Sequence, residues 1–200
     1  FGLGVAFIST FLGTIIGLVS AYVGGTLDML LQRVIDLVQT IPLLVLAIAV
    51  VAVTGPGVMK AFWILSFLSI PLRVRVVRGS VLSVREEVYI EAARSMGATN
   101  WRIMLQHIFP NVVAPIIVLT SYVIALAIVV EASLSFLGVG AQPPTPSWGA
   151  MLTGSGQNYF QTDPRLALLP GFAISIVVFA TNMFGDSLRD ELDPRLRGTR

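Results

Sequence analysis

Glu131 is a carboxylate inside a long apolar stretch, where an acidic residue is expected to have a specific role. A charge at membrane depth costs at least ~2.5 kcal/mol, so this side chain should face the bundle interior or a water-filled cavity. Two interpretations are open. With Ser133 and Ser135 it could line a polar path through the protein, or it could hydrogen-bond a neighbouring helix for packing.

Other chemistry is poorly supported by the residue types. The chain has no cysteine and a single histidine, His107, so it lacks the ligands for a metal site. Residues 55–60 faintly resemble a phosphate loop, but Gly and Lys are not adjacent and no Ser or Thr follows. We therefore expect no catalytic residues, no metal and no cofactor in this chain, with ATP bound elsewhere.

Two other function classes are weighed against transport. An intramembrane enzyme such as a protease would need a Ser with a membrane-depth Lys or His, a pair of Asp, or a His-Glu-x-x-His zinc motif. None of these arrangements is present in the sequence. A membrane scaffold that transports nothing would need no loop that docks on ATPase subunits. Co-purification of ATPase subunits with the chain would therefore distinguish a transporter from a scaffold.

The composition indicates an integral membrane protein. Of the 200 residues, 55% are hydrophobic and 12% are charged, against roughly 25% charged in an ordinary soluble domain. One soluble core cannot hide this much apolar surface, so the surplus should face lipid. We predict an all-α fold, a single transmembrane bundle over residues 1–200 that is an N-terminally truncated piece of a longer chain. A net charge of +2 gives no argument for nucleic acid.

A helix needs ~20 apolar residues to cross the hydrocarbon core. Five spans are predicted, over residues 1–27, 37–59, 58–78, 103–130 and 166–185. Their connections alternate between two sides, and the basic residues segregate. One side has Arg33, Arg73, Arg75, Arg78, Arg85, Arg94, Arg102, Arg189, Arg195, Arg197 and Arg200; the other has only Lys60 and Arg165. The first side should be cytoplasmic, which places a loop at about 79–111 inside and one at about 141–166 outside.

The inner loop reads as two short helices. The first should run from about Glu86 to Met96 and end at Gly97, where a left-handed cap is expected. The second, capped by Thr99 or Asn100, should end before Pro110. Small and apolar residues on the first helix favour docking of another protein, although an amphipathic helix lying on its own bundle would look similar.

The same loop carries the motif of a known family. Glu91-Ala92-Ala93 is followed after three residues by Gly97 and after nine more by His107-Ile108-Phe109-Pro110. This resembles the Glu-Ala-Ala signature of inner-membrane permeases of binding-protein-dependent ABC importers, with His107 and Phe109 in place of the family's Ile and Leu. Further matches indicate the dipeptide, oligopeptide and nickel branch, nearest to the C-type dipeptide permease. They include Tyr22-Val23-Gly24-Gly25, Ser133-Leu134-Ser135-Phe136-Leu137-Gly138, Trp148-Gly149 and Leu192-Asp193-Pro194-Arg195.

The resemblance implies a family core of six spans, of which this chain would contain five. It also implies a second homologous permease, two cytoplasmic ATPase subunits that bind ATP and Mg, an extracytoplasmic solute-binding protein and surrounding lipid of the bacterial inner membrane. The first loop helix would be the coupling helix on an ATPase subunit. Its predicted coupling residues are Tyr89, Glu91, Ala92, Ala93, Met96, Gly97 and Pro110. Dipeptides or oligopeptides are the expected solutes, with nickel complexes or glutathione-like peptides as alternatives.

Overall fold

A computed structural model describes residues 1–153 and 161–192, and every regular element in these ranges is helical, as predicted. The elements are α1 (Gly2–Val23), α2 (Gly25–Gln39), α3 (Leu43–Thr54), α4 (Val58–Leu68), α5 (Ile70–Arg85), α6 (Val88–Ser95), α7 (Asn100–Arg102), the π-helical segment η1 (Ile103–Ile108), α8 (Phe109–Phe136), α9 (Trp148–Met151) and α11 (Arg165–Leu192).

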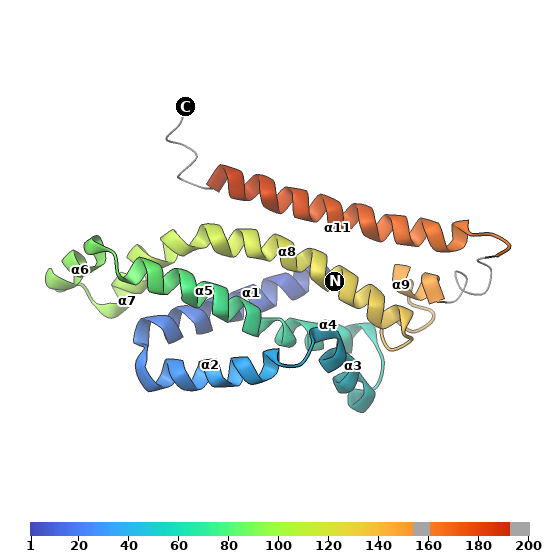
Figure 1. Cartoon of the computed structure of the whole chain (residues 1–200), viewed down its shortest axis with the longest axis horizontal. Helices are drawn as coiled ribbons and strands as arrows, with labels where there is room; N and C mark the ends of the chain where they lie inside the picture. Colours follow the sequence, from blue (N-terminus) through green and yellow to red (C-terminus); the bar gives the residue numbers. More distant parts are fainter. Residues whose placement is uncertain (154–160, 193–200) are drawn as a thin grey trace.

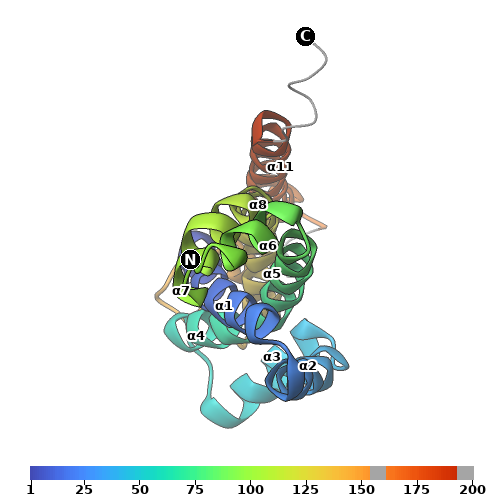
Figure 2. The ribbon, with the colours of Figure 1, turned by 90° about the vertical axis from the view of Figure 1, so that its left-hand side faces the viewer.

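The long helices run roughly along one direction (Figure 1). Helices α1, α5 and α8 form the centre of the bundle, with α2 on one side and α11 on the other, as the turned view also shows (Figure 2). The short helices α6 and α7 lie at one end, and α3, α4 and α9 lie at the opposite end. Successive long helices therefore reverse direction, which is the alternation that the charge pattern predicts.

The predicted boundaries of two spans are wrong. Three helical stretches are long and apolar enough to cross a membrane, namely α1, Asn100–Phe136 and α11, and the bent pair α2 and α3 could make a fourth. The predicted 37–59 span is broken because Pro42 cannot continue α2, and the two helices meet at 83°. The predicted 58–78 span is split at Ser69 into α4 and α5.

The second loop helix does not end before Pro110, contrary to the prediction. It continues without interruption through η1 into α8, as far as Phe136. A proline ring clashes with the carbonyl four residues earlier in a regular α-helix. The turns immediately before Pro110 are π-helical, and this wider spacing lets the helix pass the proline. The loop is thus joined rigidly to a membrane helix.

Glycines set the close approach of α1 to α5. A Cβ added at Gly13 would lie 2.4 Å from Cβ of Arg73, and one at Gly17 would lie 2.9 Å from Cβ of Val77. Both distances are too short for real side chains. Small residues at this four-residue spacing allow membrane helices to pack closely, and here the packing partner is a helix of the same chain.

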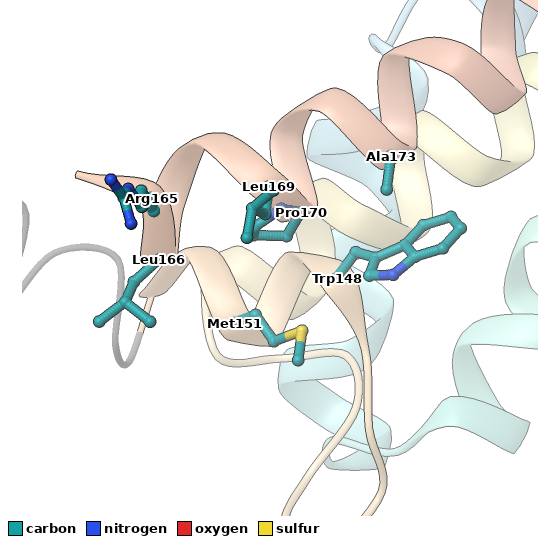
Figure 3. A pocket seen from close by; sticks show the side chains of 7 residues that line it. All are labelled: Trp148, Met151, Arg165, Leu166, Leu169, Pro170 and Ala173. Atoms are coloured by element: carbon teal, nitrogen blue, oxygen red, sulfur yellow. The ribbon is translucent and has the colours of Figure 1, made fainter. Parts of the chain in front are cut away.

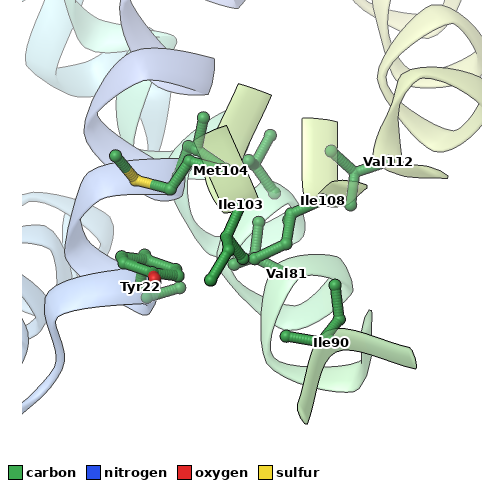
Figure 4. Close-up of a cluster of buried hydrophobic side chains, with 10 residues drawn as sticks. Tyr22, Val81, Ile90, Ile103, Met104, Ile108 and Val112 are labelled. Atoms are coloured by element: carbon green, nitrogen blue, oxygen red, sulfur yellow. The ribbon is translucent and has the colours of Figure 1, made fainter. Parts of the chain in front are cut away.

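Two groups of buried apolar side chains hold the bundle at its two ends. One, near α6, includes Tyr22, Val81, Ile90, Ile103 and Ile108 (Figure 4). The other, at the opposite end, joins α1, α3, α4 and α8 and consists of Val5, Ala47, Ala61, Leu65, Ala127, Val130 and Leu134. By contrast α11 buries little of its surface against this chain, so most of it is free to contact lipid or another subunit.

Arg73 was predicted to lie on the cytoplasmic side with the other arginines. It packs instead beside Gly13, near the middle of α1, and is buried. Arg195, Arg197, Arg200, the last part of the Leu192–Arg195 motif and residues 154–160 of the outer loop lie outside the described residues.

Gly17→Val should separate α1 from α5. The added methyl groups meet the Val74 carbonyl and the Val77 side chain, and overpacking of this kind typically costs about 1–3 kcal/mol. We expect a lower thermal midpoint for the detergent-solubilised full-length protein. Gly79→Val is the matched control, because a Cβ at this α5 glycine meets nothing within 4 Å. Equal midpoints for the two variants would contradict the packing.

Single cysteines test the orientation, since the chain has none of its own. Ser95 is exposed on α6 and Thr145 is exposed in the segment before α9, at the other end of the bundle. A membrane-impermeant maleimide should label Thr145→Cys in intact spheroplasts and Ser95→Cys only after permeabilisation. The reverse pattern would show that the orientation inferred from the basic residues is wrong.

Candidate functional site

Helix α6 is the short helix of the inner loop, and its end has the predicted cap. Gly97 has φ of +81°, in the left-handed region. Its N–H donates to the carbonyl of Arg94 (3.0 Å), and the N–H of Ala98 donates to the carbonyl of Ala93 (3.1 Å). This pair of bonds is a Schellman motif, which satisfies the last carbonyls of the helix and reverses the chain.

The turn leads at once into the next helix. The Oγ1 of Thr99 accepts from the backbone N–H of Arg102 (3.4 Å), so Thr99 is the N-cap, one of the two caps predicted. Only a few residues therefore separate α6 from the continuous helix that becomes α8.

One face of α6 is fixed to the membrane helices. Ile90 is 1% exposed and belongs to the same apolar group as Tyr22 of α1, Val81 of α5 and Ile103 of η1 (Figure 4). Ala93 is buried on the same face. Ala93 therefore faces its own chain, and its predicted coupling role stays a prediction.

The opposite face of α6 is open. Val88 and Met96 are 79% and 83% exposed, and Tyr89, Glu91 and Ala92 are also exposed. Partial burial, and secondarily the charge of Glu87, raise the pKa of the Tyr89 hydroxyl, so it stays protonated near neutral pH. Exposed apolar side chains of this size, grouped on one helix, mark a surface for another protein.

The end of the bundle near α6 is also held by an ionic cluster that sequence reasoning missed. Asp28 of α2 receives two hydrogen bonds from Arg78 of α5, each 2.7 Å, and a third from the Ser20 hydroxyl at 2.6 Å. Asp28 is 9% exposed. Its position depends on Gly24, whose φ of +69° allows the chain to reverse between α1 and α2.

Two further bonds tie the inner loop to the end of α1. The Tyr22 hydroxyl donates to Oδ1 of Asn100 (2.8 Å), and Nη1 of Arg85 donates to the Ala21 carbonyl (2.9 Å). The first joins α1 to the start of α7, and the second satisfies a carbonyl in the last turn of α1. A displacement of α6 and α7 would therefore move α1 and α5 directly.

Glu131, the acidic residue within the long apolar stretch, lies at the end of the bundle opposite to α6. Its Oε1 accepts from the hydroxyls of Ser135 (2.7 Å) and Ser147 (3.1 Å). The Ser135 hydroxyl in turn accepts from the backbone N–H of Ala141 (2.9 Å). Glu131 thus fastens the segment after α8 to α8 itself, which supports the packing interpretation.

Ser133 is placed differently from the other two predicted pathway residues. Its hydroxyl donates to the Val129 carbonyl of its own helix (2.8 Å), and its side chain lines a cavity of about 540 Å³ between α8 and α11. Pro110, predicted as a coupling residue, lies at the start of α8 and lines a different cavity of about 810 Å³ with Asn111 and Tyr122. The structure does not bring Glu131 and Ser133 into one site.

A third hollow lies between α9 and α11. Trp148 and Met151 of α9 face Leu166, Leu169 and Pro170 of α11 across it (Figure 3). Its volume is about 290 Å³, and its lining is mostly apolar. The Ser147 hydroxyl caps α9 by accepting from the Gly149 N–H (3.2 Å).

Comparison with known proteins identifies the family of this chain. The family model for the binding-protein-dependent transport system inner membrane component matches residues 13–198. The chain belongs to this family. It is a family of transport components rather than of enzymes, and its members reside in the inner membrane.

Relatives of this transport component have peptide-related names. The dipeptide transport system permease protein DppC of Alkalihalophilus pseudofirmus is 45% identical over 92% of the chain and 60% of the relative. The glutathione transport system permease protein GsiD of Pectobacterium atrosepticum is 44% identical over 93% of the chain and 62% of the relative. The chain thus spans about 60% of the length of these relatives.

The fold of this inner membrane component agrees with that assignment. A chain from an inward-facing crystal structure of the MetNI methionine ABC transporter superposes with a TM-score of 0.74, covering 96% of this chain and 93% of that one. At 20% identity this likeness shows the permease fold alone. In the described residues of this family member, no group of three or more His, Asp or Glu side chains could hold a metal.

Glu131→Leu should destabilise this permease, whereas Glu131→Gln should not. Leucine leaves the hydroxyls of Ser135 and Ser147 without their acceptor, at about 1–3 kcal/mol for each buried group left unpaired. The glutamine oxygen still accepts both bonds. Thermal unfolding and solute uptake of the assembled protein are the measurements. Ser133→Ala is the control, since its hydroxyl bonds only within α8. If Glu131→Leu has wild-type stability and uptake, Glu131 has neither the packing role nor a role in the solute path.

Proposed function

We propose that this chain is the permease subunit of an ABC importer and forms part of the path by which dipeptides or oligopeptides cross the cytoplasmic membrane. Family membership supports a transport role. A relative named as a dipeptide transport permease, 45% identical, supports the peptide solute. The chain itself catalyses nothing and binds no cofactor; ATP and Mg are bound by partner subunits.

The proposed assembly contains a second homologous permease, two cytoplasmic ATPase subunits and an extracytoplasmic solute-binding protein. Much of α11 is free for such contacts, including Phe172, Phe179 and Phe184, each more than 60% exposed. These rings suit either lipid or the second permease. The end of the bundle that carries α9 is the side on which a binding protein would deliver solute.

Glutathione is a second candidate solute. A relative named as a glutathione transport permease is 44% identical to this chain, close to the 45% identity of the dipeptide relative. Glutathione is itself a short peptide with free carboxylates, so one permease architecture suits both. Uptake assays with the two solutes, each presented by its own binding protein, would choose between them.

The observation that carries the proposal is the two-faced structure of α6. Its outer face presents Val88, Tyr89 and Met96 to a partner, while Ile90 on its inner face joins the core of α1, α5 and η1. A subunit that pushes or pulls α6 therefore moves α8 as well, because η1 continues into that helix. This is the connection that an ATP-driven importer requires.

Gly97→Val should uncouple this connection. The left-handed backbone of Gly97 strains any residue with a β-carbon by roughly 1 kcal/mol or more, most for a β-branched one. No atom lies within 4 Å of an added Cβ, so the membrane helices should stay folded. In the reconstituted transporter we expect weakened ATPase association or hydrolysis without uptake. Gly97→Asn is the matched control, because asparagine tolerates this conformation.

Ala92→Asp tests the outer face directly. Ala92 is exposed on α6, so the aspartate should not disturb folding but would place a charge in an apolar contact. Ser83→Asp, also exposed but on α5, controls for the added charge. ATPase association, hydrolysis and uptake should be measured together. Wild-type values of all three for both Gly97→Val and Ala92→Asp would leave α6 as an ordinary loop helix.

A further inference from the structure

Arg73 is the most unusual charged residue of the chain. Its side chain is only 1% exposed, and it lies beside Gly13 at mid-length of α1, far from either end of the bundle. Sequence analysis placed it with the cytoplasmic basic residues. A charge at this depth in a membrane protein usually marks a functional site.

The Arg73 guanidinium is incompletely paired. Nη1 donates to the Ser69 carbonyl (2.9 Å), in the break between α4 and α5. Nε and Nη2 are buried and have no hydrogen-bond partner. Its neighbour Arg75 pairs with Asp36, so that acid is already engaged. No carboxylate in the described part of the chain pairs with Arg73.

The surroundings of Arg73 form a cavity with polar groups. Arg73 lines a space of about 390 Å³ together with Ser69, Arg75 and Gln39, bounded by the elbow between α2 and α3. Tyr122 of α8 lines a separate cavity of about 810 Å³ that reaches Pro110. Arg73 therefore lies at the edge of the 390 Å³ hollow, with Nε and Nη2 covered.

We propose that Arg73 binds a carboxylate of the solute during its passage through the membrane domain. A guanidinium with two free N–H groups matches the two oxygens of a carboxylate. Nε and Nη2 are covered in this conformation, so the solute reaches them when the α2–α3 elbow, residues 40–42, moves aside.

This inference rests on the proposed import of peptides, all of which carry a C-terminal carboxylate. A carboxylate of the second permease could pair with Arg73 in the same way. The two sources differ in a measurable way. A carboxylate of a partner subunit would make Arg73 essential for assembly, whereas a solute carboxylate would leave the empty complex indifferent to its loss, or more stable without it.

Arg73→Met is the informative variant, because methionine keeps an unbranched stem beside Gly13 and removes the charge. The complete reconstituted transporter should assemble with a thermal midpoint equal to or above that of wild type. Uptake of a dipeptide, with the binding protein saturated, should fall roughly 10- to 100-fold, as expected for the loss of one charge-assisted contact. Arg73→Lys should retain part of the uptake, and Arg33→Gln, at an exposed position of α2, should change neither quantity.

A C-amidated dipeptide, shown separately to load the binding protein, completes the test. Wild type should transport it poorly, and Arg73→Met should transport the amide and the acid at similar low rates. Loss of assembly in Arg73→Met would overturn the inference in favour of a partner carboxylate. Equal wild-type uptake of acid and amide would overturn it as well. Absence of any peptide uptake by wild type would instead refute the proposed function.

Discussion

The close contact between α1 and α5 is the constraint on which the rest of the bundle depends. Gly13 and Gly17 have no side chains, so the backbone of α1 lies directly against Arg73 and Val77 of α5. In a membrane, packing of this kind replaces the hydrophobic effect as the force between helices. It also explains how Arg73 is buried: the stem of the arginine lies where any α1 side chain would otherwise be. Both the rigid end of the bundle near α6 and the buried charge at its centre follow from this one contact.

The inner loop is attached to that contact by several independent interactions. Ile90 packs into the core that α1 and α5 share, Tyr22 bonds Asn100, and Asp28 joins α2 to Arg78 of α5. The π-helical segment before Pro110 keeps the loop continuous with α8. A force on the outer face of α6 therefore reaches three long helices through packed side chains rather than through a flexible linker. Such a short, rigid path suits a subunit that must convert motion in a partner into motion across the membrane.

Glu131 and Arg73, two charged residues within helices of the bundle, have opposite character. Glu131 accepts two hydroxyl hydrogen bonds and holds the segment before α9 against α8, so its charge is compensated locally. Arg73 has one backbone acceptor and two buried nitrogens without partners. Buried polar groups are nearly always paired in stable folds. Glu131, whose Oε1 accepts two hydrogen bonds, therefore fits a structural role, whereas Arg73, with two buried nitrogens that lack a partner, fits an anion site.

The sequence by itself determined the fold class, the family and the character of the inner loop. Apolar stretches without charges can only be membrane helices, and the left-handed cap at Gly97 and the N-cap at Thr99 are local features that neighbouring residues decide. The breaks at Pro42 and Ser69 were missed because hydropathy windows measure apolar length and not the continuity of a helix. Which face of α6 is free, the pairing of Asp28 with Arg78 and the depth of Arg73 depend on contacts between residues distant in the chain. Only the tertiary structure could decide these, because a periodic pattern shows that a helix has two faces but not which neighbour covers each one.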